Sequence, residues 1–439
     1  MRSGVARSSA SALIGAIGIL LPLAGPAAAV SDADFEALAA KVFANPRDLD
    51  TTFEYARMAA ERNDYEAAIG ALERMLFFNP DLPRVRLELG VLYFRMGSYE
   101  MAQTYFETAR GAPDLPPDAA TKIDGFLAEI AKRRAPNQLH VFGFTGLRYQ
   151  TNANAGPDGL IVQALGHEAE LSDKFAREDD WNWFGQVTAV YAHDLGNQRG
   201  DTIESRFTGY YAKQFELSDL DLGLAEIEVG PRFAISPTSS LNVYGIAYQS
   251  FLAEDPYSTN VGIGASLRAQ IGEVGLVEPS LEYRHRFFYQ SSPYPNADDQ
   301  DGDLLSASVG WASSVGGLRL TGRAGYDRNW VADGDFDYYG YDRFSAEIGI
   351  PIDVPLPLGT WRIIPTIGGS ITLYDEPNPL VSPDVTREDD EYHYGAAFET
   401  VLTDHLGLRG QVMQTTTDSS LPNYDTNNFS VFVGVTYRD

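Results

Sequence analysis

The feature that most constrains this sequence is a two-residue alternation that begins at Leu139 and continues to the C-terminus. Apolar side chains alternate with small or charged ones, and in one segment the apolar positions are Val261, Ile263, Ala265, Leu267 and Ala269. Successive side chains of a β-strand point to opposite faces, so each such segment is typical of a half-buried strand. The region is therefore expected to be a β-structure with one apolar face.

Fourteen segments of this kind follow one another. They are 139–149, 181–193, 204–214, 219–233, 239–251, 258–271, 275–290, 303–313, 317–330, 340–352, 360–374, 391–401, 406–416 and 428–438. Most are long enough to cross a bilayer at the tilt of a barrel strand, whereas soluble sandwiches use shorter strands. The sequence predicts a 14-stranded antiparallel transmembrane β-barrel over residues 138–439.

The predicted connections differ in length on the two sides of this barrel. After even-numbered segments they are mostly short, as at 234–238 and 272–274, whereas several that follow odd-numbered segments are long and acidic, as at 150–180 and 375–390. This asymmetry is characteristic of outer-membrane barrels. We therefore predict a protein of the outer membrane of a Gram-negative bacterium, surrounded by lipid and lipopolysaccharide and inserted by the barrel assembly machinery, with both termini in the periplasm.

The first 29 residues have the pattern of a signal peptide. Arg2 and Arg7 precede an apolar stretch at 12–22, and Ala27 and Ala29 form a small-residue cleavage site. The apolar stretch is too short for a spanning helix, so we expect export followed by cleavage.

Residues 30–135 have a different composition and repeat with a period of 34 residues. Leu38, Leu72 and Phe106 are 34 apart, and the pair Asn45 and Pro46 recurs as Asn79 and Pro80. This is the tetratricopeptide pattern of paired helices. We expect a short periplasmic α-solenoid with a half repeat at 31–45, two full repeats and a capping helix at about 117–133.

The first helices of the two repeats carry candidate residues for a partner-binding groove. These are Phe53, Arg57, Leu87, Val91 and Phe94. One interpretation is a groove that binds a client protein, and the alternative is a spacer whose apolar residues pack on its own caps.

Charged side chains also occur on the small-residue face of the predicted strands. They are Arg206, Arg268, Arg284, Arg286, Arg319, Arg323, Arg343, Glu282 and Glu347. Facing lipid, each arginine would cost about 2–4 kcal/mol near the midplane, so we place these side chains in the barrel lumen. Two interpretations remain open: an arginine-lined conduit, or an Arg–Glu ladder that braces the wall.

Other function classes find little support. With 61 acidic against 33 basic side chains, the net charge of −28 disfavours nucleic-acid binding, and the absence of Cys excludes thiolate metal sites. The six histidines lack metal spacing, and alternation separates His285 from Glu282. The acidic loop 298–303 lacks the glycine position and closing Glu of an EF-hand, which leaves weak divalent binding or simple solvation. We expect no enzyme, cofactor or resident metal.

The junction of the two regions resembles the start of the barrel in the surface lipoprotein assembly modifiers. A last helix ends in Lys132, Arg133 and Arg134. It is followed by Tyr149 and by the segment that holds Thr151, Asn152, Asn154 and Pro157. The layout of signal peptide, periplasmic tetratricopeptide repeats and fourteen-stranded barrel is also similar. The helical region here is shorter than in that family, and the chain ends with Arg438 and Asp439 rather than with an aromatic residue.

The resemblance implies a translocation accessory that helps move lipid-anchored or soluble client proteins across the outer membrane. Exopolysaccharide export porins have a similar two-part plan, but with far longer repeat arrays. A solute porin with a helical periplasmic cap is a third alternative.

Overall fold

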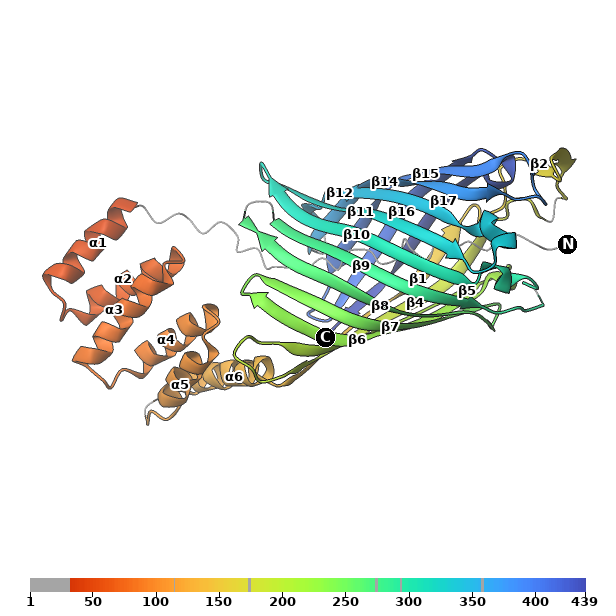
Figure 1. Cartoon of the computed structure of the whole chain (residues 1–439). Helices are drawn as coiled ribbons and strands as arrows, with labels where there is room; N and C mark the ends of the chain where they lie inside the picture. The colour runs from red at the N-terminus through yellow and green to blue at the C-terminus, as the bar shows by residue number, and fades with distance from the viewer. Residues whose placement is uncertain (1–31, 114, 173–174, 273–274, 293, 357–358) are drawn as a thin grey trace. The chain divides into compact units, whose positions relative to one another are not determined.

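The computed structural model describes residues 32–439 apart from 114, 173–174, 273–274, 293 and 357–358, so the predicted signal peptide lies outside the described residues. The described chain divides into a helical unit that ends at Gln138 and a β unit that begins at Leu139 (Figure 1). Among the described residues, none of the helices combines the length and the apolar character that a membrane-spanning helix requires.

The helical unit contains six α-helices in the described residues. They are α1 (Asp32–Ala44), α2 (Leu49–Glu61), α3 (Tyr65–Phe78), α4 (Pro83–Arg95), α5 (Tyr99–Arg110) and α6 (Pro117–Arg133). Helices α2 and α3 pack as one pair and α4 and α5 as the next, with α1 as the half repeat and α6 as the cap. This is the tetratricopeptide arrangement that the 34-residue period predicts.

Side chains at the repeat positions explain why the helices pack this closely. Leu72 and Phe106 are fully buried, and a Cβ atom on Gly90 would lie 2.6 Å from the Phe106 ring, so only glycine fits there. Asp48 caps α2 by accepting a hydrogen bond from the Thr51 amide at 3.2 Å. The Thr51 hydroxyl also donates to this carboxylate and holds the pKa of Asp48 below its ordinary value.

The β unit is one closed antiparallel barrel of fourteen strands. Its strands are β1 (Asn137–Gln150), β4 (Asp180–Asp194), β5 (Thr202–Gln214), β6 (Leu222–Ser236), β7 (Ser239–Leu252), β8 (Asp255–Ile271), β9 (Gly275–Phe288), β10 (Gly302–Val315), β11 (Leu318–Val331), β12 (Tyr341–Gly349) with its continuation β13 (Ile352–Leu356), β14 (Gly359–Pro377), β15 (Thr386–Val401), β16 (Leu406–Ser419) and β17 (Thr426–Arg438). Each pairs with its neighbour along the chain, and β1 pairs with β17 to close the wall. All fourteen predicted segments are confirmed as strands.

One predicted strand is interrupted. The segment at 340–352 becomes β12 and then β13, both of which pair with β14. Pro351 lies between them, and proline has no amide hydrogen to donate to a ladder. The two pieces therefore form a single crossing with a local break.

The connections follow the predicted asymmetry. At one end of the barrel they are short, for example 237–238 and 316–317, and at the other they include 151–179, 289–301 and 332–340. Two connections depart from this pattern: 253–254 is short on the long-loop side, and 195–201 is long on the short-turn side. The strands run obliquely side by side around one wall, as Figure 1 shows in green to blue.

Candidate functional site: the lumen and the closing seam of the barrel

The strand register separates a lipid-facing side from a luminal side. Large apolar side chains on one face are exposed, such as Ile263 and Tyr283, whereas Tyr244 and Phe184 on the other face are buried. Every charged residue predicted to line the lumen lies on the second face by register: Arg206, Arg268, Arg284, Arg286, Arg319, Arg323, Arg343, Glu282 and Glu347.

A compact ionic cluster braces the wall formed by β5 to β9. The Arg284 guanidinium lies 2.6 Å from the Glu226 carboxylate and 2.7 Å from that of Glu282, and all three side chains are at most 20% exposed. The Tyr244 hydroxyl donates to Glu282 at 2.9 Å. These contacts join strands β6, β7 and β9 across the lumen side of the wall.

A second ionic cluster lies on β11 to β15. Asp353 binds both Arg319 and Arg362, the latter at 2.9 Å, and Arg362 also lies 3.6 Å from Glu399. His393 is 3.1 Å from Glu347. Ionic contacts of the kind that the bracing interpretation describes therefore occur in two separate stretches of the wall, β5–β9 and β11–β15.

Three of the predicted luminal arginines make no ion pair in the described part of the chain, namely Arg268, Arg323 and Arg343. Arg323 donates to the Ser308 hydroxyl at 3.0 Å and Arg343 to the Thr372 hydroxyl at 3.1 Å. Arg286 contacts the Asn329 amide oxygen and lies over the Phe288 ring. The lumen thus contains both braced arginines and arginines with neutral partners.

The seam between the first and last strands is a feature that sequence reasoning missed. Phe144 of β1, Phe184 of β4 and Phe432 of β17 form a triad on the luminal side, with ring centroids 5.1 to 5.6 Å apart. Arg148 lies over Phe184 at 5.1 Å and donates to the Tyr210 hydroxyl at 3.3 Å. Alternation places Arg148 inward, but nothing local to the sequence shows that β17 is its neighbour.

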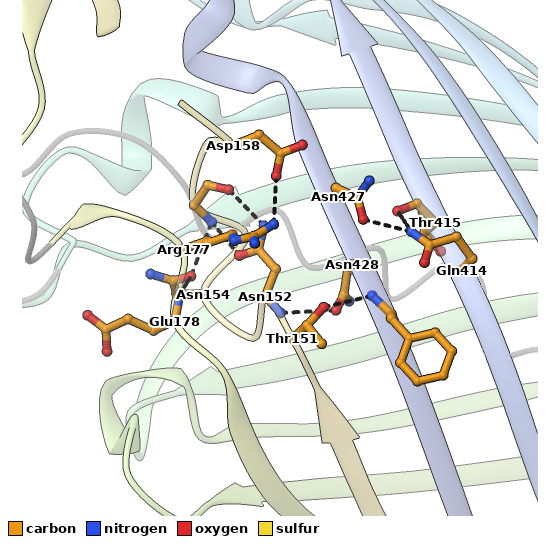
Figure 2. A network of polar contacts seen from close by, with 12 residues as sticks. Thr151, Asn152, Asn154, Asp158, Arg177, Glu178, Gln414, Thr415, Asn427 and Asn428 are labelled. Carbon is orange, nitrogen blue, oxygen red and sulfur yellow. Dashed lines mark hydrogen bonds and ion pairs between the residues drawn. The ribbon is translucent and has the colours of Figure 1, made fainter. Parts of the chain in front are cut away.

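Polar contacts continue the seam at the long-loop end (Figure 2). The Asn152 amide donates to the Asn428 side chain at 3.1 Å, and the Phe429 amide donates to the Thr151 hydroxyl at 2.8 Å. Asn154 accepts from the Glu178 amide and so ties the two ends of the first loop together. The segment that resembles the assembly modifiers therefore builds the rim of the seam.

The first loop, 151–179, contains a hairpin that is hydrogen-bonded to neighbouring loops. Its hairpin, β2 (Ile161–Ala164) and β3 (His167–Glu170), has a turn that bonds through the Leu165 amide to the Leu380 carbonyl at 3.1 Å. The Gln163 amide donates to Asn423 at 2.8 Å. These contacts place the hairpin at the long-loop end, beside the loops that follow β14 and β16.

Backbone packing at the seam yields a prediction. A Cβ on Gly146 would lie 2.3 Å from the Val433 carbonyl oxygen, whereas one on Gly143 would have 3.7 Å to its nearest neighbour. Gly146→Ala should therefore force β1 away from β17 and destabilise the refolded barrel by about 1–3 kcal/mol, the usual cost of overpacking. Gly143→Ala is the matched control and should be close to wild type in urea unfolding. Equal stability of the two variants would contradict this account of the seam.

The structure places the apolar residues of the predicted partner groove against neighbouring helices. Leu87, Val91 and Phe94 are half-buried and pack against a core formed by α5 and α6, with Phe94 5.2 Å from the Phe126 ring. Phe53 packs on the core of α2 to α4 and lies under Arg84. These four side chains hold neighbouring helices together, which is the packing that the spacer interpretation describes. Arg57 is exposed and pairs with Glu61.

The acidic loop has ordinary local roles. The Asp301 carboxylate accepts from the Phe288 amide at 2.6 Å, and Asp298 accepts from the Gln290 side chain at 2.6 Å. Desolvation and the neighbouring Asp298 raise the pKa of Asp299. Among the described residues no group of His, Cys, Asp or Glu has the arrangement of a metal site.

Comparison with known proteins agrees with the barrel geometry. Residues 236–438 match the model of the outer membrane protein beta-barrel domain. This chain is an outer-membrane β-barrel protein. The match covers the strands from β7 to β17, and the closed wall extends the same architecture to β1. No curated protein matches the chain.

The similar solved structures cover only a small part of the chain. The type III secretion translocator chaperone SycD of Yersinia enterocolitica is 14% identical over 23% of this chain and 71% of its own, with a TM-score of 0.22. PcrH, in complex with the chaperone-binding region of PopD, is 16% identical over 24% and 80%, with a TM-score of 0.22. MamA is 20% identical over 23% and 52%, with a TM-score of 0.21. Scores this low support no conclusion about this protein.

Proposed function

We propose that this protein is an outer-membrane translocation accessory that helps deliver client proteins, among them lipoproteins, to the cell surface. In this proposal the helical unit is periplasmic and binds the client. The observation that carries it is the rim network, in which Asn152 and Thr151 of the modifier-like segment engage Asn428 and Phe429 of the last strand. The resemblance thus falls on residues with a defined structural role.

The connectivity supports the orientation. Helix α6 ends at Arg133 and β1 begins at Asn137, so the chain enters the barrel at the end with the short connections. In outer-membrane barrels the short turns are periplasmic and the long loops extracellular. A helical unit that is joined to the periplasmic end of β1 would meet clients before they cross the membrane.

The test compares surface proteins of wild-type and deletion strains by protease accessibility. We expect a defined set of surface proteins to be retained inside the deletion strain while surface polysaccharide is unchanged, and the full chain to restore display. Arg57→Glu on α2 should reduce display if the first helices bind the client, whereas Arg74→Glu on α3 is the matched charge reversal and should not. Loss of polysaccharide with an unaltered surface proteome would instead support an export porin.

A solute porin is the second candidate, and the luminal arginines without ion pairs favour it. A large, steady conductance in planar bilayers that scales with salt would support this candidate. A translocator that is closed at rest should show small or intermittent conductance.

A further inference from the structure

The luminal side of the closing seam differs in charge from the rest of the wall. On β16, β17, β1 and β4 the luminal positions between the two rims contain no Asp or Glu. We call this surface the seam strip, and its central residues are Phe144, Arg148, Phe184, Arg409, Gln411 and Phe432. The stretches β5–β9 and β11–β15 instead contain luminal carboxylates, which pair with some of their arginines, such as Arg284 and Arg319.

Two arginines, Arg148 and Arg409, give the seam strip a positive charge that forms no ion pair within the described part of the chain. Neither Arg148 nor Arg409 forms an ion pair with any described residue, and the Nε atom of each is buried without a hydrogen-bond partner. The carboxylate opposite Arg409 on β15, Glu399, lies beside Arg362. A half-buried guanidinium without an opposite charge favours a bound anion, because burial weakens the solvation that water would supply.

An apolar surface lies directly beside this charge. Phe184 is 1% exposed, and Phe144 and Phe432 pack on it while remaining only partly buried. Such rings are unusual in a lumen, where water normally contacts polar side chains. They offer a face against which a planar or apolar body can pack.

We propose that the seam strip binds an organic carboxylate that carries an apolar group. The carboxylate pairs with the guanidinium groups of Arg148 and Arg409, and the apolar group packs against Phe144 and Phe432. Guanidinium and carboxylate match in geometry and form charge-assisted hydrogen bonds. The carboxylate comes either from a free small acid or from the C-terminus of a peptide in the lumen. This inference goes beyond the proposed function, because it does not involve the helical unit.

The test uses the purified full chain in detergent, with benzoate as the probe in calorimetric titration. We expect Arg148→Gln to weaken benzoate binding about tenfold or more, as loss of a charged hydrogen-bonded partner should. Arg148→Lys should retain part of the affinity. Arg319→Gln is the matched control, because Arg319 is luminal but lies on the other wall beside Asp353, and it should bind like wild type.

Further probes separate the contribution of the charge from that of the apolar packing, and they identify the source of the carboxylate. Inorganic phosphate and cyclohexanol should each bind at least about tenfold more weakly than benzoate. Phosphate lacks the apolar group, and cyclohexanol lacks the carboxylate. A short peptide that ends in Phe should compete with benzoate only if its C-terminus is a free carboxylate, and tighter binding than benzoate would identify a peptide as the natural source. Heat-modifiable migration on gels verifies that each variant is folded. Absence of benzoate binding to the wild type, or equal binding by folded Arg148→Gln, would overturn the proposal.

Discussion

Truncation of the chain before Asn428 is expected to abolish insertion into the outer membrane. Strand β17 pairs with β1 over 142–150 and with β16 over 406–417, so its loss leaves two unpaired strand edges. Each unsatisfied backbone group in the hydrocarbon costs several kcal/mol, because lipid offers no hydrogen-bond partner. The truncated chain should be absent from the outer-membrane fraction and should show no heat-modifiable band.

Removal of Asp439 alone is the control for this truncation. Asp439 contacts Val141 through its amide and its carboxylate, at 3.2 and 3.1 Å, but it lies beyond β17. Its loss frays the end of the seam and leaves both ladders intact, so insertion should persist. A truncated chain that still migrates in a heat-modifiable form would contradict the closure of the barrel by β17.

Arg284→Met should be the most destabilising single substitution in the lumen. It removes the guanidinium that pairs with both Glu226 and Glu282 and leaves these two largely buried carboxylates without a positive partner. Removing one partner of a buried ion pair costs about 3–5 kcal/mol, mainly because the remaining charge is left uncompensated. Urea unfolding of the refolded protein in detergent should show this loss as a lower midpoint.

Two further variants separate this explanation from a general loss of packing. The triple variant Arg284→Met, Glu226→Gln, Glu282→Gln should recover most of the stability, because no buried charge remains. Arg57→Met removes an ion pair with Glu61 that is about half exposed, and it should cost less than about 1 kcal/mol. If the triple variant were no more stable than the single one, the ionic cluster would not be the source of the effect.

The helical groove illustrates where the sequence leaves two interpretations open. Leu87, Val91 and Phe94 occupy first-helix positions of a tetratricopeptide repeat, and the pattern alone allows them either to line a groove or to contact the next helix. The position of α6 decides between the two, because Ile123 and Ile130 bury their side chains against the α4–α5 pair. Packing of this kind depends on the whole array, which a 34-residue period does not specify.

The number of strands, the asymmetry of their connections and the face on which each luminal arginine lies were all predictable from the sequence. These properties depend on local alternation, and alternation is visible in a single segment. Which charged side chains contact one another was not predictable, because it depends on the folded barrel. Arg284 reaches Glu226 from 58 residues away, and the Asn152 amide reaches Asn428 from 276 residues away. Closure and register set such pairs, and register is a cooperative property of two strands at once. For that reason the braced clusters emerge only when their own strands are in register, and the acid-free seam strip emerges only when β1 and β17 lie side by side.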